Sequence, residues 1–185
     1  CNLAGANPGS VSYHFGGKEQ LYLATAEYLA RHIRSQLHQE IGDIEHQLDT
    51  DPQVEHRDLL RRLIHALVHD ILQGELSADA AGFIFREQLQ PTGAFDILYR
   101  ELMAPMQRTF RRLLTGALGI AISEQELKLT THALMGQILV FRFGQSTILR
   151  MLDANHFTAS DINEVAVLIT NNTLAAIDAR RLQDH

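Results

Sequence analysis

The sequence is poor in cysteine and in aromatic side chains: it has one cysteine, Cys1, no tryptophan, and 6% aromatic residues in 185. A single cysteine forms no disulfide within the chain, so folding requires no oxidising compartment. No apolar run reaches the roughly 18 residues that a membrane-spanning helix needs. These absences lead us to expect a cytoplasmic protein with no membrane association.

Motifs of the common catalytic sites are also missing. There is no nucleophile elbow or glycine-rich phosphate loop, and the Glu-x-x-His pairs that hold metals inside helical bundles do not occur. His65 and His69 have the spacing of metal ligands on a helix, but they stand beside Arg61 and Arg62 and near no third ligand. Cationic neighbours disfavour a metal, so a solvated helix face is the better interpretation. We predict a protein that is not an enzyme and has no metal and no cofactor.

Charge is unevenly distributed along the chain. The net charge of −6 argues against a general nucleic-acid binder. Residues 1–18, however, contain no Asp or Glu and end on Lys18, and the first acidic residue is Glu19. If the chain contacts nucleic acid, this end is the one that permits it.

Signals for β-strands are scarce, whereas apolar residues recur at intervals of three and four along the whole chain. This periodicity predicts an all-α fold. One long helix is expected from Lys18 to about Leu48, and the next is expected to start at Asp51 and Pro52. Ser77 is expected to cap a further helix.

The second half of the chain carries two helix-start signatures and one helix breaker. Ser123 with Glu126, and Thr158 with Asp161, each have the spacing of a capping box. Pro105 lies inside an otherwise continuous apolar pattern. It should kink the helix there, because proline lacks the amide hydrogen and clashes with the preceding turn.

The last two long helical patterns carry more apolar surface than one core needs. Residues 133–143 are apolar almost all the way round, and the final helix has a wide apolar face. A helix that is apolar beyond one stripe needs a second packing partner. We therefore expect a homodimer in which these two helices of each subunit close a four-helix bundle, with a thick monomer core as the alternative.

The segment NLAGANPGSVSYHF has the shape of the second half of a helix-turn-helix. Leu3 and Ala4 would end a first helix, Gly5 would make the turn, and Asn7 followed by Pro8 is a favourable helix start. Such a second helix presents its N-terminal residues to base edges in the major groove. Spacing alone does not distinguish it from the many short helix–glycine–helix turns of other proteins.

The identities of the residues are more specific than their spacing. The segment AGANPGSVSYHFGGKEQLY closely resembles the signature of the tetracycline-repressor (TetR) family. Downstream, FIFREQLQPTGAFDILYRELMAPM and THALMGQILVFRFGQSTIL resemble the ligand-binding domain of the subgroup typified by the CecR regulator. The resemblance implies an all-helical, dimeric, bacterial one-component regulator, typically a repressor. It also implies binding to operator DNA that a small-molecule effector releases or alters.

The resemblance also assigns DNA contacts and domain limits. Lys18 matches the family's phosphate-contacting lysine, and Ser12 stands where many members have a second tyrosine. The other implied DNA contacts are Asn7, Pro8, Gly9, Ser10, Tyr13 and His14. We expect residues 1–17 to be the remnant of a truncated DNA-binding domain, residues 18–48 a connecting helix, and residues 49–185 the ligand-binding and dimerisation domain. The first helix of the helix-turn-helix is expected before Cys1.

An effector site needs an apolar cavity between helices with a few polar groups. The side chains that we expect to line it combine adaptable methionines and aromatics with three charged groups. They are Phe83, Arg86, Glu87, Tyr99, Met103, Met106, His132, Met135, Phe141 and Arg142. The alternative interpretation of the arginines and Glu87 is that they form buried structural ion pairs.

A second functional hypothesis fits the same composition. A helical bundle that binds a small molecule or a partner protein, with no role on DNA, would carry a similar apolar periodicity. The residues encoded upstream of Cys1 discriminate between the two hypotheses. A basic helix and a Thr-rich helix start there would support the regulator, because a helix-turn-helix needs its first helix, whereas an initiator Met immediately before Cys1 would contradict it.

Overall fold

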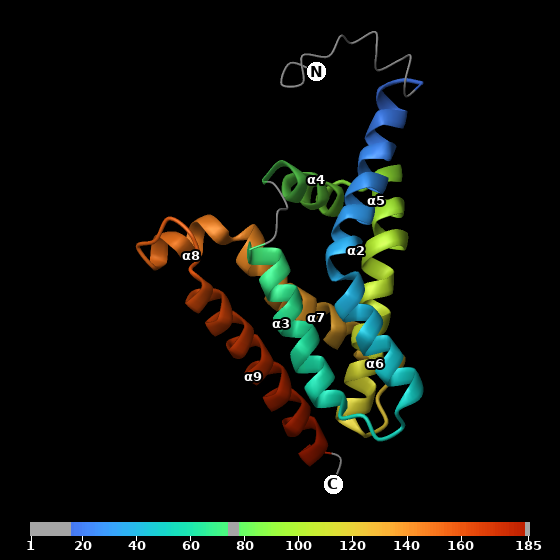
Figure 1. Ribbon diagram of the computed structural model, residues 1–185, viewed down its shortest axis with the longest axis vertical. Helices are drawn as coiled ribbons and strands as arrows, with labels where there is room; N and C mark the ends of the chain where they lie inside the picture. The colour runs from blue at the N-terminus through green and yellow to red at the C-terminus, as the bar shows by residue number, and fades with distance from the viewer. Residues whose placement is uncertain (1–15, 74–77, 184–185) are drawn as a thin grey trace. The chain divides into compact units, whose positions relative to one another are not determined.

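The computed structural model describes residues 16–73 and 78–183, and in these two ranges it contains helices and connecting turns but no strand (Figure 1). The prediction of an all-α fold is confirmed. The elements are α2 (Lys18–Thr50), α3 (His56–Gln73), α4 (Ala78–Leu89), α5 (Gly93–Leu98), the π-helical turn η1 (Tyr99–Met103), α6 (Ala104–Leu118), α7 (Glu124–Phe143), α8 (Gln145–Met151) and α9 (Ala159–Gln183). No helix of the described ranges is long and apolar enough to cross a membrane.

The chain divides into two compact units. The first contains the N-terminal part of α2, up to Ser35, together with residues 77–105, which include α4, α5 and η1. The second contains residues 36–76 and 106–185, which include the rest of α2, α3, most of α6, and α7 to α9.

Small side chains form the centre of the first unit. Ala26 and Ala30 of α2 are buried with Ala94 and Leu98 of α5. Alanines at a helix crossing let the two backbones approach closely because little volume separates them. At the start of α5, a Cβ on Gly93 would lie 3.4 Å from a methyl carbon of Leu23. The first half of α2 is therefore packed tightly against α5.

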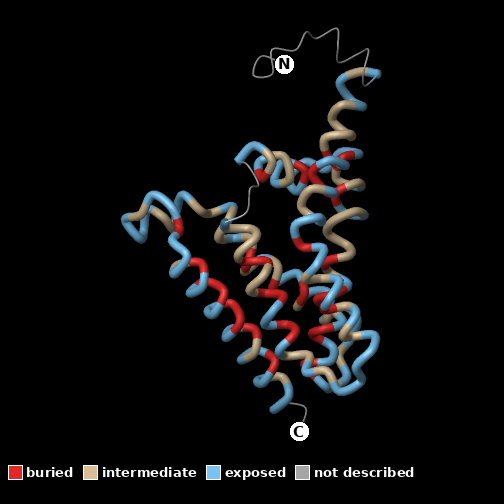
Figure 2. Tube along the Cα trace, viewed as in Figure 1, coloured by how far each residue is buried: buried red, intermediate tan, exposed pale blue. Residues whose placement is uncertain are grey.

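Large aliphatic side chains form the core of the second unit. The apolar stripe of α3 is buried from Leu59 to Val68, and α3 lies alongside α9 (Figure 1). The stripe consists of Leu59, Leu60, Leu63, Ile64, Leu67 and Val68. In Figure 2, buried and exposed positions alternate along α3 and α9, as expected for helices with one buried face.

The start of α3 differs from the prediction. The helix begins at His56, not at Asp51 and Pro52. The Asp51 carboxylate accepts a hydrogen bond from the Gln53 backbone N–H at 2.9 Å, which closes a turn of the Asx type. An aspartate can stabilise a turn or cap a helix with the same oxygen, and here it stabilises the turn. The predicted cap at Ser77 lies outside the described residues.

The capping box at Thr158 and Asp161 is confirmed with both of its bonds, and Ser123 is confirmed as the N-cap of α7. The Ser123 hydroxyl accepts a hydrogen bond from the Glu126 N–H at 3.2 Å at the start of α7. Before α9, the Asp161 carboxylate accepts the Thr158 N–H at 2.7 Å, and the Thr158 hydroxyl oxygen accepts the Asp161 N–H at 3.2 Å. These bonds satisfy amide hydrogens that have no partner inside a helix.

The irregularity predicted at Pro105 takes the form of the π-helical turn η1 just before it. The Ala104 N–H donates to the Tyr99 carbonyl, five residues back, instead of the usual four. Proline lacks an amide hydrogen, and its ring crowds the carbonyl four residues earlier, so the preceding turn widens.

The apolar surface of α7 is only partly covered within one chain. Leu134 and Ile138 are buried, but Leu129 is 63% and Val140 57% exposed. The expectation that residues 133–143 are buried on more than one side is therefore not met by the single chain. Within that chain α7 packs mainly on α3 and α9, which leaves its other face open.

Candidate functional site

The helix that would follow a DNA-reading head starts at Lys18. Gly16 and Gly17 have φ angles of 75° and 136°, a backbone region that favours glycine. The helix α2 begins directly after them. The Lys18 side chain is exposed at the N-terminus of α2, where backbone N–H groups and the helix dipole attract anions. The other implied DNA contacts, Asn7 to Ser10 and Ser12 to His14, lie outside the described residues and stay predictions.

The ten residues predicted for an effector site belong to both units. Phe83, Arg86, Glu87, Tyr99 and Met103 lie in the first unit, whereas Met106, His132, Met135, Phe141 and Arg142 lie in the second. Each group is described within its own unit. A single site that contains all ten therefore stays a prediction.

Glu87 of α4 is the polar centre of the first unit. It is 1% exposed. One carboxylate oxygen, Oε1, accepts the Tyr22 hydroxyl of α2 at 2.7 Å. The other, Oε2, accepts the Thr92 N–H at 3.0 Å and the Thr92 hydroxyl at 2.9 Å. The Tyr22 ring also packs on Phe83, with a centroid distance of 4.7 Å, so an aromatic pair shields the carboxylate.

Hydrogen bonds keep Glu87 ionised. Burial by itself would raise its pKa, but the bonds from Tyr22 and Thr92 favour the charged form, and the net pKa lies below its ordinary value. The same contact raises the pKa of Tyr22, because its proton is held by the carboxylate and the ring is partly desolvated. At neutral pH the pair is a phenol donating to a carboxylate.

Arg86 does not belong to a buried ion pair, contrary to the alternative interpretation. Its side chain is exposed while that of Glu87 is buried, because consecutive side chains on a helix point about 100° apart. Tyr99 is 46% exposed and its ring stacks on Phe95, with centroids 6.1 Å apart. The Met103 sulfur accepts the Gln88 amide N–H at 3.3 Å.

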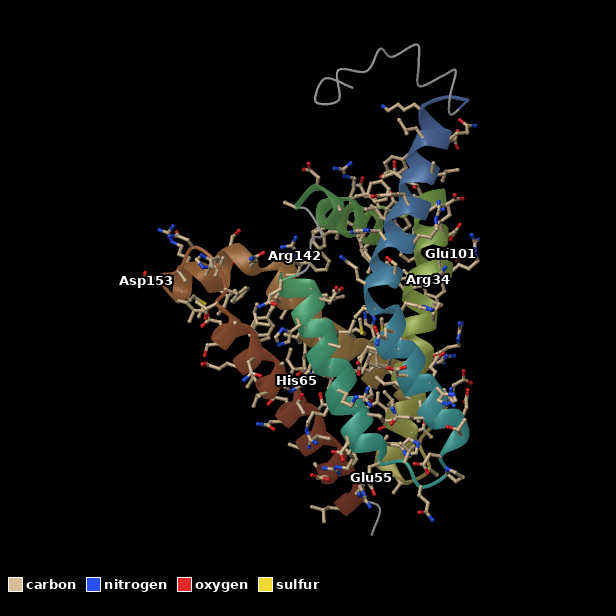
Figure 3. The ribbon with its side chains drawn as sticks, in the orientation of Figure 1. Arg34, Glu55, His65, Glu101, Arg142 and Asp153 are labelled. Atoms are coloured by element: carbon tan, nitrogen blue, oxygen red, sulfur yellow. The ribbon has the colours of Figure 1, made fainter. Side chains whose placement is uncertain are left out.

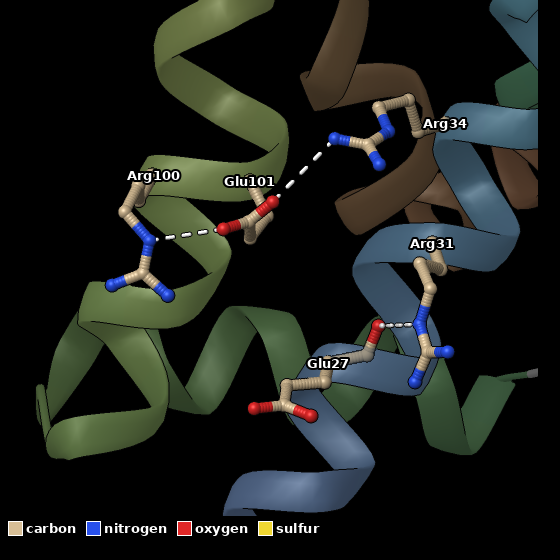
Figure 4. A network of polar contacts seen from close by, with 5 residues as sticks. All are labelled: Glu27, Arg31, Arg34, Arg100 and Glu101. Carbon is tan, nitrogen blue, oxygen red and sulfur yellow. Dashed lines mark hydrogen bonds and ion pairs between the residues drawn. The ribbon is translucent and has the colours of Figure 1, made fainter.

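A charged network lies on the surface of the first unit (Figure 4). Glu101 of η1 accepts Arg100 Nε at 2.9 Å and lies 3.5 Å from Arg34 Nη1 of α2. The Arg100 bond, and after it the nearby positive charges, hold the Glu101 pKa below its ordinary value. Exposed pairs of this kind add little stability.

In the second unit the predicted residues are dispersed. Met106 is buried in the core, Met135 and Phe141 are half-buried against it, and His132 is exposed. Arg142 of α7 donates to the Gln145 side-chain oxygen at 2.9 Å (Figure 3 shows Arg142). A shared effector pocket for these five residues stays a prediction.

The histidine pair on α3 is half-buried, not on a fully solvated face as predicted. Burial lowers the pKa of His65 (Figure 3), and the neighbouring His69 and Arg61 lower it further. Within the ranges that the structure describes, no three acidic, histidine or cysteine side chains are placed to hold a metal ion.

The second unit has a groove that the sequence analysis missed. Its volume is about 380 Å³, and apolar side chains of α6 and α7 meet polar ones of α7 and α9 along it. It is lined by Leu114, Leu118, Glu126, Leu129, Thr130, Ala133, Leu134, Gln137, Asn172, Thr173, Ala176, Ile177 and Arg180. Arg180 of α9 closes one side by donating to Thr130 of α7 at 2.9 Å and pairing with Glu126 at 3.2 Å. A volume of this size suits a small ligand.

The described residues form an all-helical bundle of the kind found in the C-terminal domains of TetR-type regulators. The family model of the C-terminal domain of the HTH-type transcriptional dual regulator CecR matches residues 56–180. The protein named HTH-type transcriptional dual regulator CecR from Shigella flexneri is 34% identical over 149 residues, which are 79% of this chain and 66% of the relative. This chain therefore belongs to the CecR C-terminal domain family, and the predicted resemblance is confirmed.

Proposed function

We propose that this chain is the sensor part of a one-component transcription regulator that binds operator DNA through a helix-turn-helix ending at α2. The family match over residues 56–180 carries the proposal. A second support is the start of α2, where two glycines with positive φ precede an exposed lysine. The protein acts in the cytoplasm, where the DNA is, and is not an enzyme. In this proposal residues 1–17 belong to the DNA-binding domain, residues 18–48 form the connecting helix, and residues 49–185 form the sensor domain.

Lys18 tests the DNA part of this proposal. In the full-length protein, Lys18→Ala should weaken binding to all duplex sequences and reduce the salt slope of log Kd by about one per subunit, about two for the dimer, because each subunit loses one phosphate contact. The matched control is Lys128→Ala, the other lysine of the chain, which is paired with Glu124 on α7. An unchanged slope in Lys18→Ala, or an equal change in the control, rules out the phosphate role.

The homodimer is proposed to form through α7 and α9. Both helices expose large apolar side chains, among them Val140 of α7 and Val167 and Leu168 of α9. Leu168→Asp should shift the protein from dimer to monomer in sedimentation velocity, because a buried unpaired charge is costly at an interface. Leu152, which follows α8, is 51% exposed like Leu168, so Leu152→Asp is the matched control. A dimer that survives Leu168→Asp contradicts this interface.

The effector is proposed to be a small molecule that contacts the predicted residues, with Tyr99 as the first to test. Tyr99→Ala should change the response to the effector more than the affinity for DNA. A thermal-shift screen identifies the effector, since a ligand that binds only the native state raises the melting temperature. If an effector is found and Tyr99→Ala leaves its binding as in the wild type, the site lies elsewhere.

The groove between α7 and α9 favours the second candidate function, a ligand-binding helical protein without a role on DNA. Both candidates predict hits in the thermal-shift screen. Only the regulator predicts sequence-specific binding of the full-length protein to duplex DNA. A protein that binds a small molecule but no duplex supports the second candidate.

A further inference from the structure

We propose that Glu87 is a positioning residue that fixes the first turns of α2, and with them Lys18, against α4 and α5. The carboxylate lies in the first unit, and its hydrogen bonds go to Tyr22 and Thr92, not to the helix start itself. It acts through Tyr22, one turn after Lys18. The consequence for DNA rests on the proposed function, whereas the effect on α2 does not.

The two oxygens of Glu87 serve two different segments. Oε1 holds the Tyr22 hydroxyl of α2, and Oε2 holds the backbone and side chain of Thr92. Thr92 is also the N-cap of α5, where its hydroxyl oxygen accepts the Ala94 N–H at 3.2 Å. A continuous line of hydrogen bonds therefore joins the start of α5, the end of α4 and the start of α2.

The position of Tyr22 makes this line important for Lys18. The side chains of Lys18, Glu19 and Gln20 are exposed, so they do not anchor the first turn. Anchoring begins in the next turn, where Tyr22 packs on Phe83 and Leu23 approaches Gly93. The hydrogen bonds of the Tyr22 hydroxyl, to Glu87 and with Arg86, are the contacts with a fixed direction, because hydrogen bonds are angular and apolar contacts are not.

The chemistry of Glu87 suits a fixed position. A buried carboxylate is tolerated only while its hydrogen bonds are made. Movement of Tyr22 away from Glu87 would leave Oε1 without that donor in a buried place. The free-energy cost of breaking this bond keeps α2 and α4 in one register. A pair of apolar side chains of similar size would not specify that register.

The test uses Tyr22→Phe in the full-length protein, because this change removes one hydroxyl and keeps the ring on Phe83. Tyr28→Phe is the matched control: it lies on the same helix, is 62% exposed, and stacks on His32 of that helix. Amide hydrogen exchange of residues 21–24, the first amides with acceptors inside the helix, should become roughly tenfold faster in Tyr22→Phe and stay unchanged in Tyr28→Phe. Equal exchange in both variants overturns the proposal, and so does an equal acceleration in α3, which would show a general loss of stability.

Measurements of DNA affinity distinguish the positioning of Lys18 by Glu87 from a general contribution of Glu87 to stability. Tyr22→Phe should weaken duplex binding several-fold in the wild-type background and have little effect in a Lys18→Ala background, because the contact that it positions is already gone. The same loss in both backgrounds overturns the positioning role. If the wild-type protein binds no duplex, the proposed function fails while the exchange measurement still decides whether Glu87 fixes α2.

Discussion

Gly116 of α6 is the position where the structure predicts the sharpest effect of a single methyl group. A Cβ at Gly116 would lie 2.0 Å from Cδ2 and 2.3 Å from Cγ of the His56 imidazole, which begins α3. Real Cβ contacts essentially never fall below 3.0 Å. The clash includes the ring atom nearest the backbone, so the ring must leave its place. We expect Gly116→Ala to force His56 out or to push α3 away from α6.

Two opposing terms decide the sign of this change. Alanine in place of glycine inside a helix gains about 1 kcal/mol from propensity. Forcing an extra methyl group into a packed contact costs about 1–3 kcal/mol. The ring would have to move by about 1 Å or more, so we place the cost at the upper end of that range. The free energy of unfolding should fall by about 1–2 kcal/mol in Gly116→Ala.

Urea denaturation of four proteins checks this reasoning as a double-mutant cycle. Wild type, Gly116→Ala, His56→Ala and the double variant are compared. Without the imidazole only the propensity term remains, so adding Gly116→Ala to His56→Ala should stabilise the protein by about 1 kcal/mol. A Gly116→Ala protein that is more stable than the wild type would refute the packing argument.

Two further predictions concern polar groups. The lowered pKa of Glu87 contributes stability that is present above its ordinary, unfolded value near 4.5 and is lost as pH falls through the folded value. Urea titrations at decreasing pH should therefore show a shallower acid loss in Glu87→Gln than in wild type, and identical profiles would contradict the ionised assignment. Ser123→Ala removes the N-cap of α7 and should lower the free energy of unfolding by about 1 kcal/mol. Ser146→Ala, at an exposed position of α8, should leave it unchanged within about 0.5 kcal/mol, and equal losses would show that the cap is not the cause.

Local patterns predicted most of the helices. The stripe from Leu59 to Val68 and the capping box at Thr158 depend on residues three or four apart, so the sequence contains the whole signal. The predicted start of α3 was wrong for a local reason. The Asp51 carboxylate can bond the backbone of a turn or of a helix start, and the sequence does not show which of the two forms. Pro105 predicted an irregularity in the helix but not its π-helical form.

Contacts between distant residues could not be predicted in this way. Tyr22 and Glu87 are 65 positions apart, and the sequence shows only a tyrosine in one helical pattern and an acidic residue in another. Glu87 was selected as a ligand candidate by its residue type, whereas the structure places it in a buried polar cluster. The groove beside Arg180 was missed because its polar members look like ordinary solvated faces of α7 and α9. Tertiary packing decides each of these cases.

The central claim is that the full-length protein is a dimeric DNA-binding regulator. Selection of duplexes from a random library by the full-length protein tests it directly. A two-fold dimer should enrich an inverted repeat whose half-sites are about one helical turn, or a multiple of it, apart. Enrichment of such a repeat is the predicted result. A library that remains random after repeated rounds, with the folded protein confirmed, would contradict the claim.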